Sequence, residues 1–437
     1  MSDPLSLTHR RVLAVALPVV LSNATVPILG AVDTGVVGQM GEAAPIGAVG
    51  IGAIALTAIY WIFGFLRMGI AGLTAQAEGA GRKGEVSALL SRAMIIALAA
   101  GFVIVALQMP FIWLALQTAP ASAEVETLAQ TYMGIRIYGA PAAIGIYGLT
   151  GWMIGLERTR SVLIVQLWMN GLNIALDLWF VLGLGWGVEG VAIATLIAEW
   201  SGLFLGLWLC RDALKTPAWR DWPRVFDRVQ MIQFARVNRD ILLRSVVLQG
   251  IFLSFVFLGA RFGDVTLAAN HVLLQFLEIT AYSMDGFAIA AETLVGQSMG
   301  ARSVAGVRRA ALMTSFWGMI TVICTAAGFV LFGPAIIDLM TTAPNVRAEA
   351  RIYLPYMIAA PLVGCAAWML DGIFIGATRS GDMRNMMALS AVIYIVALLV
   401  LMPLVGNHGL WLALLISFIA RGITLGWKYP ALERVAA

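Results

Sequence analysis

Long apolar stretches separated by short polar loops run through almost the whole chain of 437 residues. Because a bilayer core about 30 Å thick requires roughly 20 apolar residues in a helix, each stretch is a candidate transmembrane segment. Twelve stretches reach this length: residues 11–39, 47–77, 92–117, 131–155, 161–183, 188–210, 240–261, 266–297, 308–337, 351–376, 385–405 and 408–428. The pattern predicts an all-α integral membrane protein with twelve transmembrane helices.

The composition supports this prediction. Hydrophobic residues make up 60% of the chain and charged residues only 12%, whereas a soluble domain carries about 25% charged residues. The net charge of +4 comes from bases placed beside the apolar stretches, which indicates the lipid bilayer, and no nucleic acid, as the partner. The three cysteines lie in apolar stretches without CxxC spacing, so no metal site or disulfide framework is expected.

The loops between the predicted helices differ in charge. With both termini in the cytoplasm, the inner side carries 21 of the 28 Lys and Arg residues, seven of them in the stretch 211–239. The outer loops carry only Arg261, Arg347 and Arg351. The positive-inside rule therefore predicts that both termini lie in the cytoplasm. We expect the protein in the inner (cytoplasmic) membrane of the cell. No small-residue cleavage site follows Arg10 and Arg11, so the first apolar segment is expected to remain as a helix.

Two parts of the chain resemble each other at a spacing of 221 residues. The segments LTGWMIGLER (149–158) and LDGIFIGATR (370–379) agree at five of ten positions. Frequent Gly and Leu in apolar helices is the alternative explanation, but the spacing, the number of spans and the loop charges all agree with an internal repeat. The same spacing relates three more identical pairs: Gln76 and Gln297, Gly79 and Gly300, and Ala80 and Ala301.

Each half contains six predicted helices and begins on the inner side. The two bundles are therefore expected to be related by a pseudo-two-fold axis along the membrane normal. We predict an N-terminal six-helix lobe at 1–210, a cytoplasmic connecting segment at 211–239 and a C-terminal six-helix lobe at 240–437. Trp219, Trp222 and the bases of the connecting segment suit a position on the membrane surface. Two such bundles about a central cleft are typical of transporters that work by alternating access.

Four segments carry a resemblance to a known family. They are VALPVVLSNATVPILGAVDTGVVGQ (15–39), FLRMGIAGLTAQAEGAG (65–81), NIALDLWFVLGLGWGVEGVAIATLIAE (173–199) and LDGIFIGATRSGDMRN (370–385). Together they resemble the MATE (multidrug and toxin extrusion) family, and within it the DinF (DNA-damage-inducible protein F) branch. The resemblance implies a secondary transporter that exports chemically varied organic compounds, often cationic, by antiport with protons or sodium. A fold-level likeness alone does not establish function.

Ionisable side chains inside a membrane span are rare and are functional hypotheses by default. Asp33 lies 22 residues after Arg11, which places it about 33 Å along the first helix, in its outer half. Asp177 on the fifth helix, Asn173 four residues before it, and Thr195 on the sixth helix are predicted at a similar depth.

The resemblance implies a role for these four residues. The N-terminal lobe of MATE proteins holds an ion or proton site, and its first-helix aspartate, Asn-x-x-x-Asp pair and threonine correspond to Asp33, Asn173/Asp177 and Thr195. The alternative is that these residues only hydrogen-bond neighbouring helices, which is common for Asn and Thr. Oxygen-rich sites also bind hard cations, so sodium at the Asp33/Asp177 site stays open beside the proton. No organic cofactor is expected.

The C-terminal half carries acids at other depths. Glu278 and Asp285 lie in the eighth predicted helix and Asp371 in the tenth, and the repeat equivalents of Asp285 and Asp371 are not acidic. We expect this set to line a substrate cavity for small organic cations or amphiphiles. Alternatively, Arg67 in the second helix is the counter-ion of Asp285 or Asp371. Glu292 is expected to be solvated, and Glu199 has no evident partner. We expect the protein to function as a monomer.

Two other functions compete with an ion-driven exporter. A lipid-linked oligosaccharide flippase of the same superfamily would need a basic cavity for its anionic pyrophosphate cargo. Away from the ends of the predicted spans, the clear intramembrane bases are few, namely Arg67, Arg136, Arg244 and Arg421. An intramembrane enzyme is disfavoured, because the sequence contains no HExxH, GxSxG or DDxxD motif, and the absence of a Walker A motif argues against ATP hydrolysis.

Overall fold

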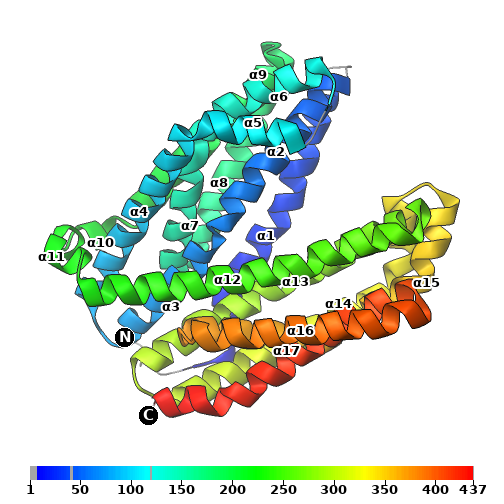
Figure 1. Cartoon of the computed structure of the whole chain (residues 1–437). Coiled ribbons are helices and arrows are strands. Elements are labelled where there is room, and N and C mark those ends of the chain that lie inside the picture. The colour runs from blue at the N-terminus through cyan, green and yellow to red at the C-terminus, as the bar shows by residue number, and fades with distance from the viewer. Residues whose placement is uncertain (1–6, 40–42, 119–120, 437) are drawn as a thin grey trace. The chain divides into compact units, whose positions relative to one another are not determined.

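All regular elements in the described part of the chain are helices (Figure 1). The structure, a computed structural model, describes residues 7–39, 43–118 and 121–436. Four side chains within the first helix, those of Ile28, Ala31, Asp33 and Thr34, lie outside this description.

The N-terminal half contains six helical spans. The first is α1 (His9–Gly38), and the fifth and sixth are α8 (Thr159–Asp177) and α9 (Gly187–Leu209). Each of the three spans between them consists of two helices: α2 (Ala43–Ile62) with α3 (Gly64–Gly79), α4 (Lys83–Ala106) with α5 (Gln108–Thr118), and α6 (Ala123–Arg136) with α7 (Ala140–Gly155).

The C-terminal half consists of six long helices. Short helical turns precede it: α10 (Arg211–Leu214), η3 (Pro217–Arg220) and α11 (Trp222–Val225). The long helices are α12 (Arg228–Gly259), α13 (Asp264–Gly300), α14 (Val304–Met340), α15 (Pro344–Gly376), α16 (Ser380–Val405) and α17 (Asn407–Ala436). Among the described residues, eleven spans are long and apolar enough to cross a membrane, and α1 corresponds to the remaining predicted span.

The breaks within the N-terminal spans follow from local sequence. Pro110 lies in the first turn of α5 and Pro141 in the first turn of α7, positions where a missing backbone N–H costs nothing. A 3₁₀ turn, η1 (Ile137–Gly139), joins α6 to α7. Several helices also begin earlier than predicted, such as α4 at Lys83, because their polar first turns extend beyond the apolar core.

The chain divides into two compact units. Unit 1 comprises Met1–Val20, Ala75–Gly81 and Ile232–Ala437, and unit 2 comprises Leu21–Thr74 and Arg82–Met231. This division differs from the boundaries predicted from the sequence, because the beginning of α1 and the end of α3 pack with the C-terminal helices. The two units are described separately below.

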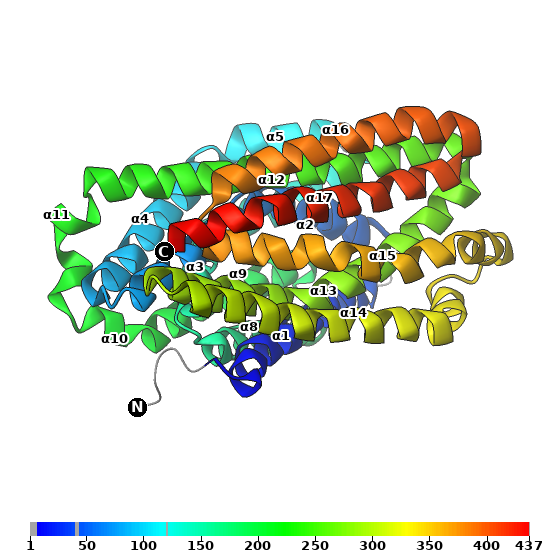
Figure 2. The ribbon, with the colours of Figure 1, turned by 90° about the horizontal axis from the view of Figure 1, so that it is seen from below.

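Unit 1 has an aromatic core. Helices α13 to α17 lie side by side (Figures 1 and 2), with α15 packed against α13, α14 and α17. Phe255 of α12 meets the ring of Trp411 edge-on, with 4.5 Å between ring centroids, and Phe276 meets Phe329 in the same way at 4.8 Å. All four side chains are buried in one hydrophobic cluster.

A reciprocal contact explains why the end of α3 belongs to unit 1. A Cβ on Gly79 would lie 1.9 Å from the carbonyl oxygen of Gln297, and a Cβ on Gly300 would lie 2.0 Å from that of Gln76. Only glycine permits so close an approach of two backbones. These four residues are equivalent in the predicted repeat, so each repeat contacts the corresponding position of the other, as expected about a local two-fold axis.

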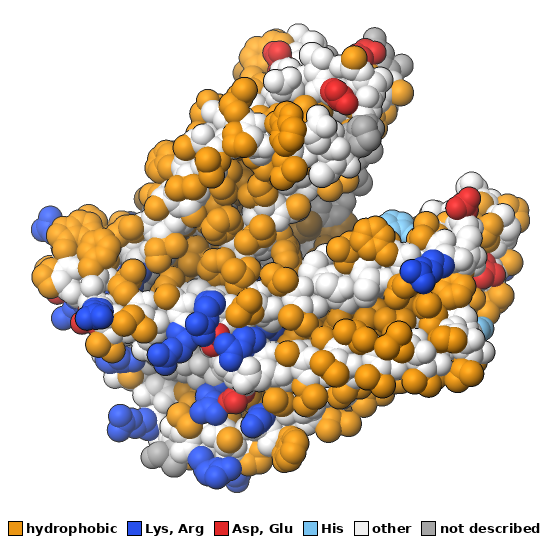
Figure 3. Space-filling view, viewed as in Figure 1, with side chains coloured by type: hydrophobic (Ala, Val, Ile, Leu, Met, Phe, Trp, Pro, Cys, Tyr) orange, Lys and Arg blue, Asp and Glu red, His pale blue; other side chains and the backbone are white. Residues whose placement is uncertain are grey.

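Unit 2 is held by apolar contacts among its own helices. Its core includes Leu56 and Tyr60 of α2, Met133 of α6 and Val191 of α9, with α8 packed along α9 and α4 along α7. Gly101 of α4 lies against the backbone of Pro141, where a Cβ would approach to 2.3 Å. In Figure 3, hydrophobic side chains cover the flanks of the helices, which suits contact with lipid.

Candidate functional site

A polar stripe runs along α8. Gln166, Asn170, Asn173 and Asp177 follow one another at intervals of three or four residues, which places them on one face of the helix. Asn170, Asn173 and Asp177 are buried, and Asp177 is 0% exposed. Directly after Asp177 the helix widens into the π-helical turn η2 (Leu178–Gly183). Such turns occur often at functional sites.

The C-terminal part of this stripe contacts α9. The Nδ2 of Asn173 donates a hydrogen bond to the Oγ1 of Thr195 at 3.1 Å, and this hydroxyl donates to the carbonyl oxygen of Val191 at 3.0 Å. The structure thus brings together Asn173 and Thr195, two of the four residues that the sequence grouped. Asp177 lies one helical turn beyond Asn173 on the same face.

The N-terminal part of the stripe contacts α1. Gln166 Nε2 donates to Asn170 Oδ1 at 3.0 Å, and Asn170 Nδ2 donates to Thr25 Oγ1 at 2.8 Å. Thr25 in turn donates to the carbonyl oxygen of Ser22 at 2.7 Å. The hydrogen bond between Thr25 and Asn170 therefore fixes the height of α1 against α8.

The height of α1 relative to α8 gives the level of Asp33, whose side chain lies outside the described residues. By connectivity, α1 and α8 run in the same direction across the membrane. Asp33 follows Thr25 by eight residues and Asp177 follows Asn170 by seven, which correspond to about 12 Å and about 10.5 Å of helix. The backbone position of Asp33 on α1 is therefore level with Asp177.

A buried ion pair joins two other helices of unit 2. Arg136 Nη1 lies 2.7 Å from Glu199 Oε2, and both side chains are nearly buried. The Tyr60 hydroxyl donates to the carbonyl oxygen of Arg136 at 3.3 Å. Gly139 is required beside the pair, because a Cβ there would lie 2.2 Å from Glu199 Oε2. The expectation that Glu199 has no partner was wrong. Arg136, the last residue of α6, forms an ion pair with Glu199 of α9.

In unit 1, Asp371 lies between two arginines. Its Oδ2 accepts from Arg244 of α12 and from Arg421 of α17, and all three side chains are buried. Asp371 therefore receives positive charge from two helices of its own bundle. Arg67 belongs to the other compact unit, so the alternative in which Arg67 is a counter-ion of Asp285 or Asp371 stays a prediction.

Three acids of α13, namely Glu278, Asp285 and Glu292, occupy environments that differ from one another. Glu278 and Asp285 are exposed and seven residues apart, on the face that also carries Tyr282. Asp285 acts electrostatically on Arg244. Glu292, which we expected to be solvated, is only 2% exposed. The chain passes close by at this point, because a Cβ on Gly376 would lie 2.2 Å from the carbonyl oxygen of Glu292.

Arg67 is half-buried in α3. Its Nη1 atom is buried and has no hydrogen-bond partner among the described residues. Its backbone carbonyl packs against Gly151 of α7, where a Cβ would approach to 2.3 Å. Among the described residues, no group of three His, Cys, Asp or Glu side chains is arranged to hold a metal ion.

Sequence reasoning missed several of these residues. The spacing of Gln166 and Asn170 before Asn173 was visible as a continuous polar face, and Thr25 is the α1 residue that the stripe reaches. The partners of Asp371 were among the four intramembrane arginines, but sequence spacing gave no means of pairing them across helices.

An apolar pocket of about 370 Å³ lies within unit 1 at α12 and α13. Phe255, Leu267 and Leu274 contribute apolar surface, and Asp264 and His271 are among its lining residues.

Two bundles of membrane-spanning helices, with carboxylates and amides buried at membrane depth, define a polytopic membrane protein of the kind found among secondary transporters. The family model MatE matches residues 18–179 and again 241–404. The chain therefore belongs to the MATE family of multidrug efflux transporters, and one match in each half confirms the internal repeat.

Individual relatives agree with this assignment. DNA damage-inducible protein F of Escherichia coli (strain K12) is 39% identical over 427 residues, which cover 94% of this chain and 90% of that protein. Protein DETOXIFICATION 44, chloroplastic, of Arabidopsis thaliana is 25% identical, covering 95% of this chain and 81% of the relative. The bent form of the Vibrio cholerae MATE transporter VcmN superposes with a TM-score of 0.88 at 17% identity, covering 98% and 97% of the two chains. The predicted twelve-helix, two-lobe fold is confirmed.

Proposed function

We propose that this protein exports small organic compounds, mainly cations and amphiphiles, from the cytoplasm by antiport with protons. The observation that carries the proposal is the stripe on α8, which ends at the buried Asp177 with the Asn173–Thr195 hydrogen bond beside it. A membrane-embedded carboxylate that can be neutral or charged is suited to carry a proton.

Asp33 completes the proposed site, because the register of α1 and α8 puts its backbone level with Asp177. Burial and the repulsion between two carboxylates favour uptake of a proton by the pair. Proton uptake on the outer side and release to the cytoplasm would bias the lobes between outward-open and inward-open forms. Pro18 and Pro27 provide points in α1 where bending costs no backbone hydrogen bond.

The charges of the chain favour cationic or neutral cargo over an anionic one. Three of the four intramembrane arginines, namely Arg136, Arg244 and Arg421, are paired with carboxylates of their own unit. The exposed carboxylates of Glu278 and Asp285 and the apolar pocket at α12 and α13 suit organic cations with apolar bodies. The inner membrane and a cytoplasmic position of both termini complete the proposal, on the strength of the loop charges.

The test is efflux of a fluorescent organic cation from proteoliposomes, measured under a pH gradient alone and then under a sodium gradient alone. We expect transport with the pH gradient and none with sodium. Transport with sodium alone would replace the proton by sodium as the coupling ion, and transport with neither gradient would contradict antiport.

A further inference from the structure

The segment between the two bundles presents a surface that antiport does not use. This surface, here named the connecting face, consists of the apolar side chains of Trp222, Phe226 and Val229 and the bases Arg220 and Arg228. All five belong to unit 2 and all are exposed.

The apolar part of the connecting face is large for a surface in water. Trp222 is 53% exposed, Phe226 55% and Val229 70%. They lie four and three residues apart, and the rings of Trp222 and Phe226 stack with centroids 6.0 Å apart and planes inclined by 24°. Grouped exposed apolar side chains of this kind mark an interaction site with a membrane or a partner.

The bases of the connecting face are available for an anion. Within the described part of the chain, neither Arg220 nor Arg228 forms an ion pair, whereas their neighbour Arg224 is paired with Asp221 at 3.3 Å. In Figure 3, basic and hydrophobic side chains lie next to one another over α10 and α11. An aromatic and basic surface of this composition matches the boundary between acyl chains and anionic headgroups.

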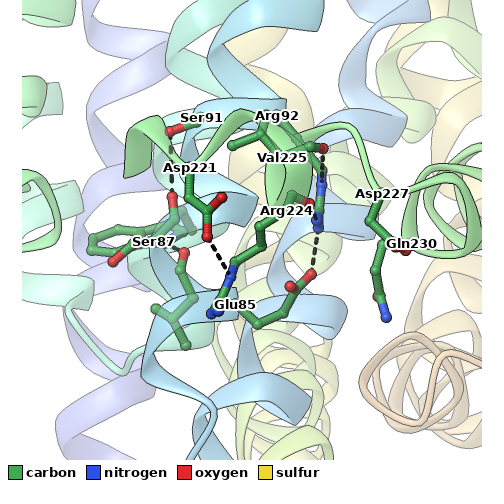
Figure 4. Close-up of polar contacts among 11 residues, drawn as sticks. Glu85, Ser87, Ser91, Arg92, Asp221, Arg224, Val225, Asp227 and Gln230 are labelled. Carbon is green, nitrogen blue, oxygen red and sulfur yellow. Dashed lines mark hydrogen bonds and ion pairs between the residues drawn. The ribbon is translucent and has the colours of Figure 1, made fainter. Parts of the chain in front are cut away.

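The connecting face is held in place by α4 (Figure 4). Arg92, whose side chain is 1% exposed, donates from Nε to the carbonyl oxygen of Val225 at 2.7 Å and from Nη2 to that of Arg224 at 2.6 Å. Ser91 Oγ donates to the carbonyl oxygen of Trp219 at 2.6 Å. These bonds satisfy the carbonyl groups at the end of α11 and fix the direction in which its side chains point.

The attachment also places the connecting face at a membrane edge. Ser91 and Arg92 lie within the first ten residues of α4, a candidate span. Close by in sequence, Trp208 is the second-last residue of the span α9, and the guanidinium of Arg211 lies over its ring at 4.2 Å from the centroid. An amphipathic aromatic ring beside a base is typical of the interfacial region of a bilayer.

We propose that the connecting face is a binding site for anionic phospholipids of the cytoplasmic leaflet. Trp222, Phe226 and Val229 enter the acyl boundary, and Arg220 and Arg228 bind the headgroup phosphates. Anionic lipids give the cytoplasmic leaflet its negative surface potential, and this is the leaflet that the loop charges assign to the segment. The site is independent of the proposed proton coupling, because none of its residues lies on α1, α8 or α9.

The test uses the full-length protein with one fluorescent label. In a Val229→Cys variant that also carries Cys324→Ser, an environment-sensitive fluorophore is attached at position 229. Cys210 and Cys365 are buried and are left unchanged. The protein is reconstituted in phosphatidylcholine vesicles with increasing fractions of phosphatidylglycerol. We expect a blue shift of the emission and protection from an aqueous quencher as the anionic fraction rises.

Arg228→Gln should weaken this response. The fraction of phosphatidylglycerol at which the blue shift is half complete should rise by about fivefold, the factor that corresponds to roughly 1 kcal/mol for one base beside an anionic surface. Adding Arg220→Gln should prevent saturation. Arg309→Gln removes another exposed base, outside the connecting face, and should change nothing. If the label is protected from the quencher equally in pure phosphatidylcholine and in phosphatidylglycerol-containing vesicles, the connecting face does not recognise anionic lipid and the proposal is overturned. The proposal is also overturned if the label stays in water in both lipids, because the connecting face is then open to solvent or to a soluble partner.

Discussion

The buried pair of Arg136 and Glu199 should couple strongly in folding. At 2.7 Å, with both side chains about a tenth exposed, each charge is solvated mainly by the other. Removing one partner from such a pair leaves an uncompensated buried charge and costs about 3–5 kcal/mol, whereas replacing both by neutral residues of similar volume is often nearly neutral. We therefore expect Arg136→Met and Glu199→Gln each to destabilise the protein by about 3 kcal/mol or more.

The double variant should be no less stable than either single variant, which gives a coupling energy of at least about 3 kcal/mol. The assay is reversible unfolding in mixed detergent micelles, with the free energy of unfolding determined for the wild type, both single variants and the double variant. The pair of Arg308 and Glu433 is the control, because its distance is similar at 2.8 Å but the Arg308 side chain is 62% exposed. Its coupling energy should stay below about 1 kcal/mol. Additive effects of Arg136→Met and Glu199→Gln would refute the reasoning.

Three further predictions concern topology, the acids of unit 1 and the contact of the repeats. A cysteine at Ala121 should react with a membrane-impermeant reagent added to intact cells and one at Arg82 should not, and the reverse result would invert the predicted orientation. Asp371→Asn should reduce the yield of folded protein, because two buried guanidinium groups lose their counter-ion. Asp285→Asn should fold and lose efflux of cations more than of neutral compounds; equal losses would exclude a role in charge selection. Gly79→Ala should lower thermal stability because its Cβ would lie 1.9 Å from a carbonyl oxygen, whereas Gly250→Ala, with nothing within 4 Å, should not; equal stability of the two variants would argue against this close contact.

Most of the fold could be predicted from the sequence, because hydropathy and loop charge are local properties of the chain. The apolar lengths gave the twelve spans, and the matches of Gln76 and Gly79 with Gln297 and Gly300 gave the repeat. The composition of the compact units could not be predicted in this way. The beginning of α1 and the end of α3 pack with α13 because of backbone approaches at glycine, which leave no hydrophobic pattern.

The same distinction applies to the site. The shared face of Asn173 and Asp177 could be predicted from the sequence, because the two residues lie one helical turn apart on a single helix. The partners of Glu199 and Asp371 come from helices distant in sequence, so no periodicity relates them. The exposure of Asp285 and the burial of Glu292 likewise depend on which face of α13 meets α15, and both residues have the same apolar neighbourhood in the sequence.

The central claim is that Asp33 and Asp177 carry the coupling proton. The most direct measurement is proton-gradient-driven efflux of a fluorescent organic cation from proteoliposomes containing Asp33→Asn or Asp177→Asn, with substrate binding measured on the same preparations. Asn238→Ala is the control, because it removes a buried polar side chain outside the α8 stripe, whose hydrogen bond goes to Phe234 of its own helix, without removing a carboxylate. We expect both Asp variants to fold and bind substrate but to lose gradient-driven efflux, and Asn238→Ala to retain it. Efflux at the wild-type rate in both Asp variants would contradict this account, because the carboxylates would then serve only to hold the helices together.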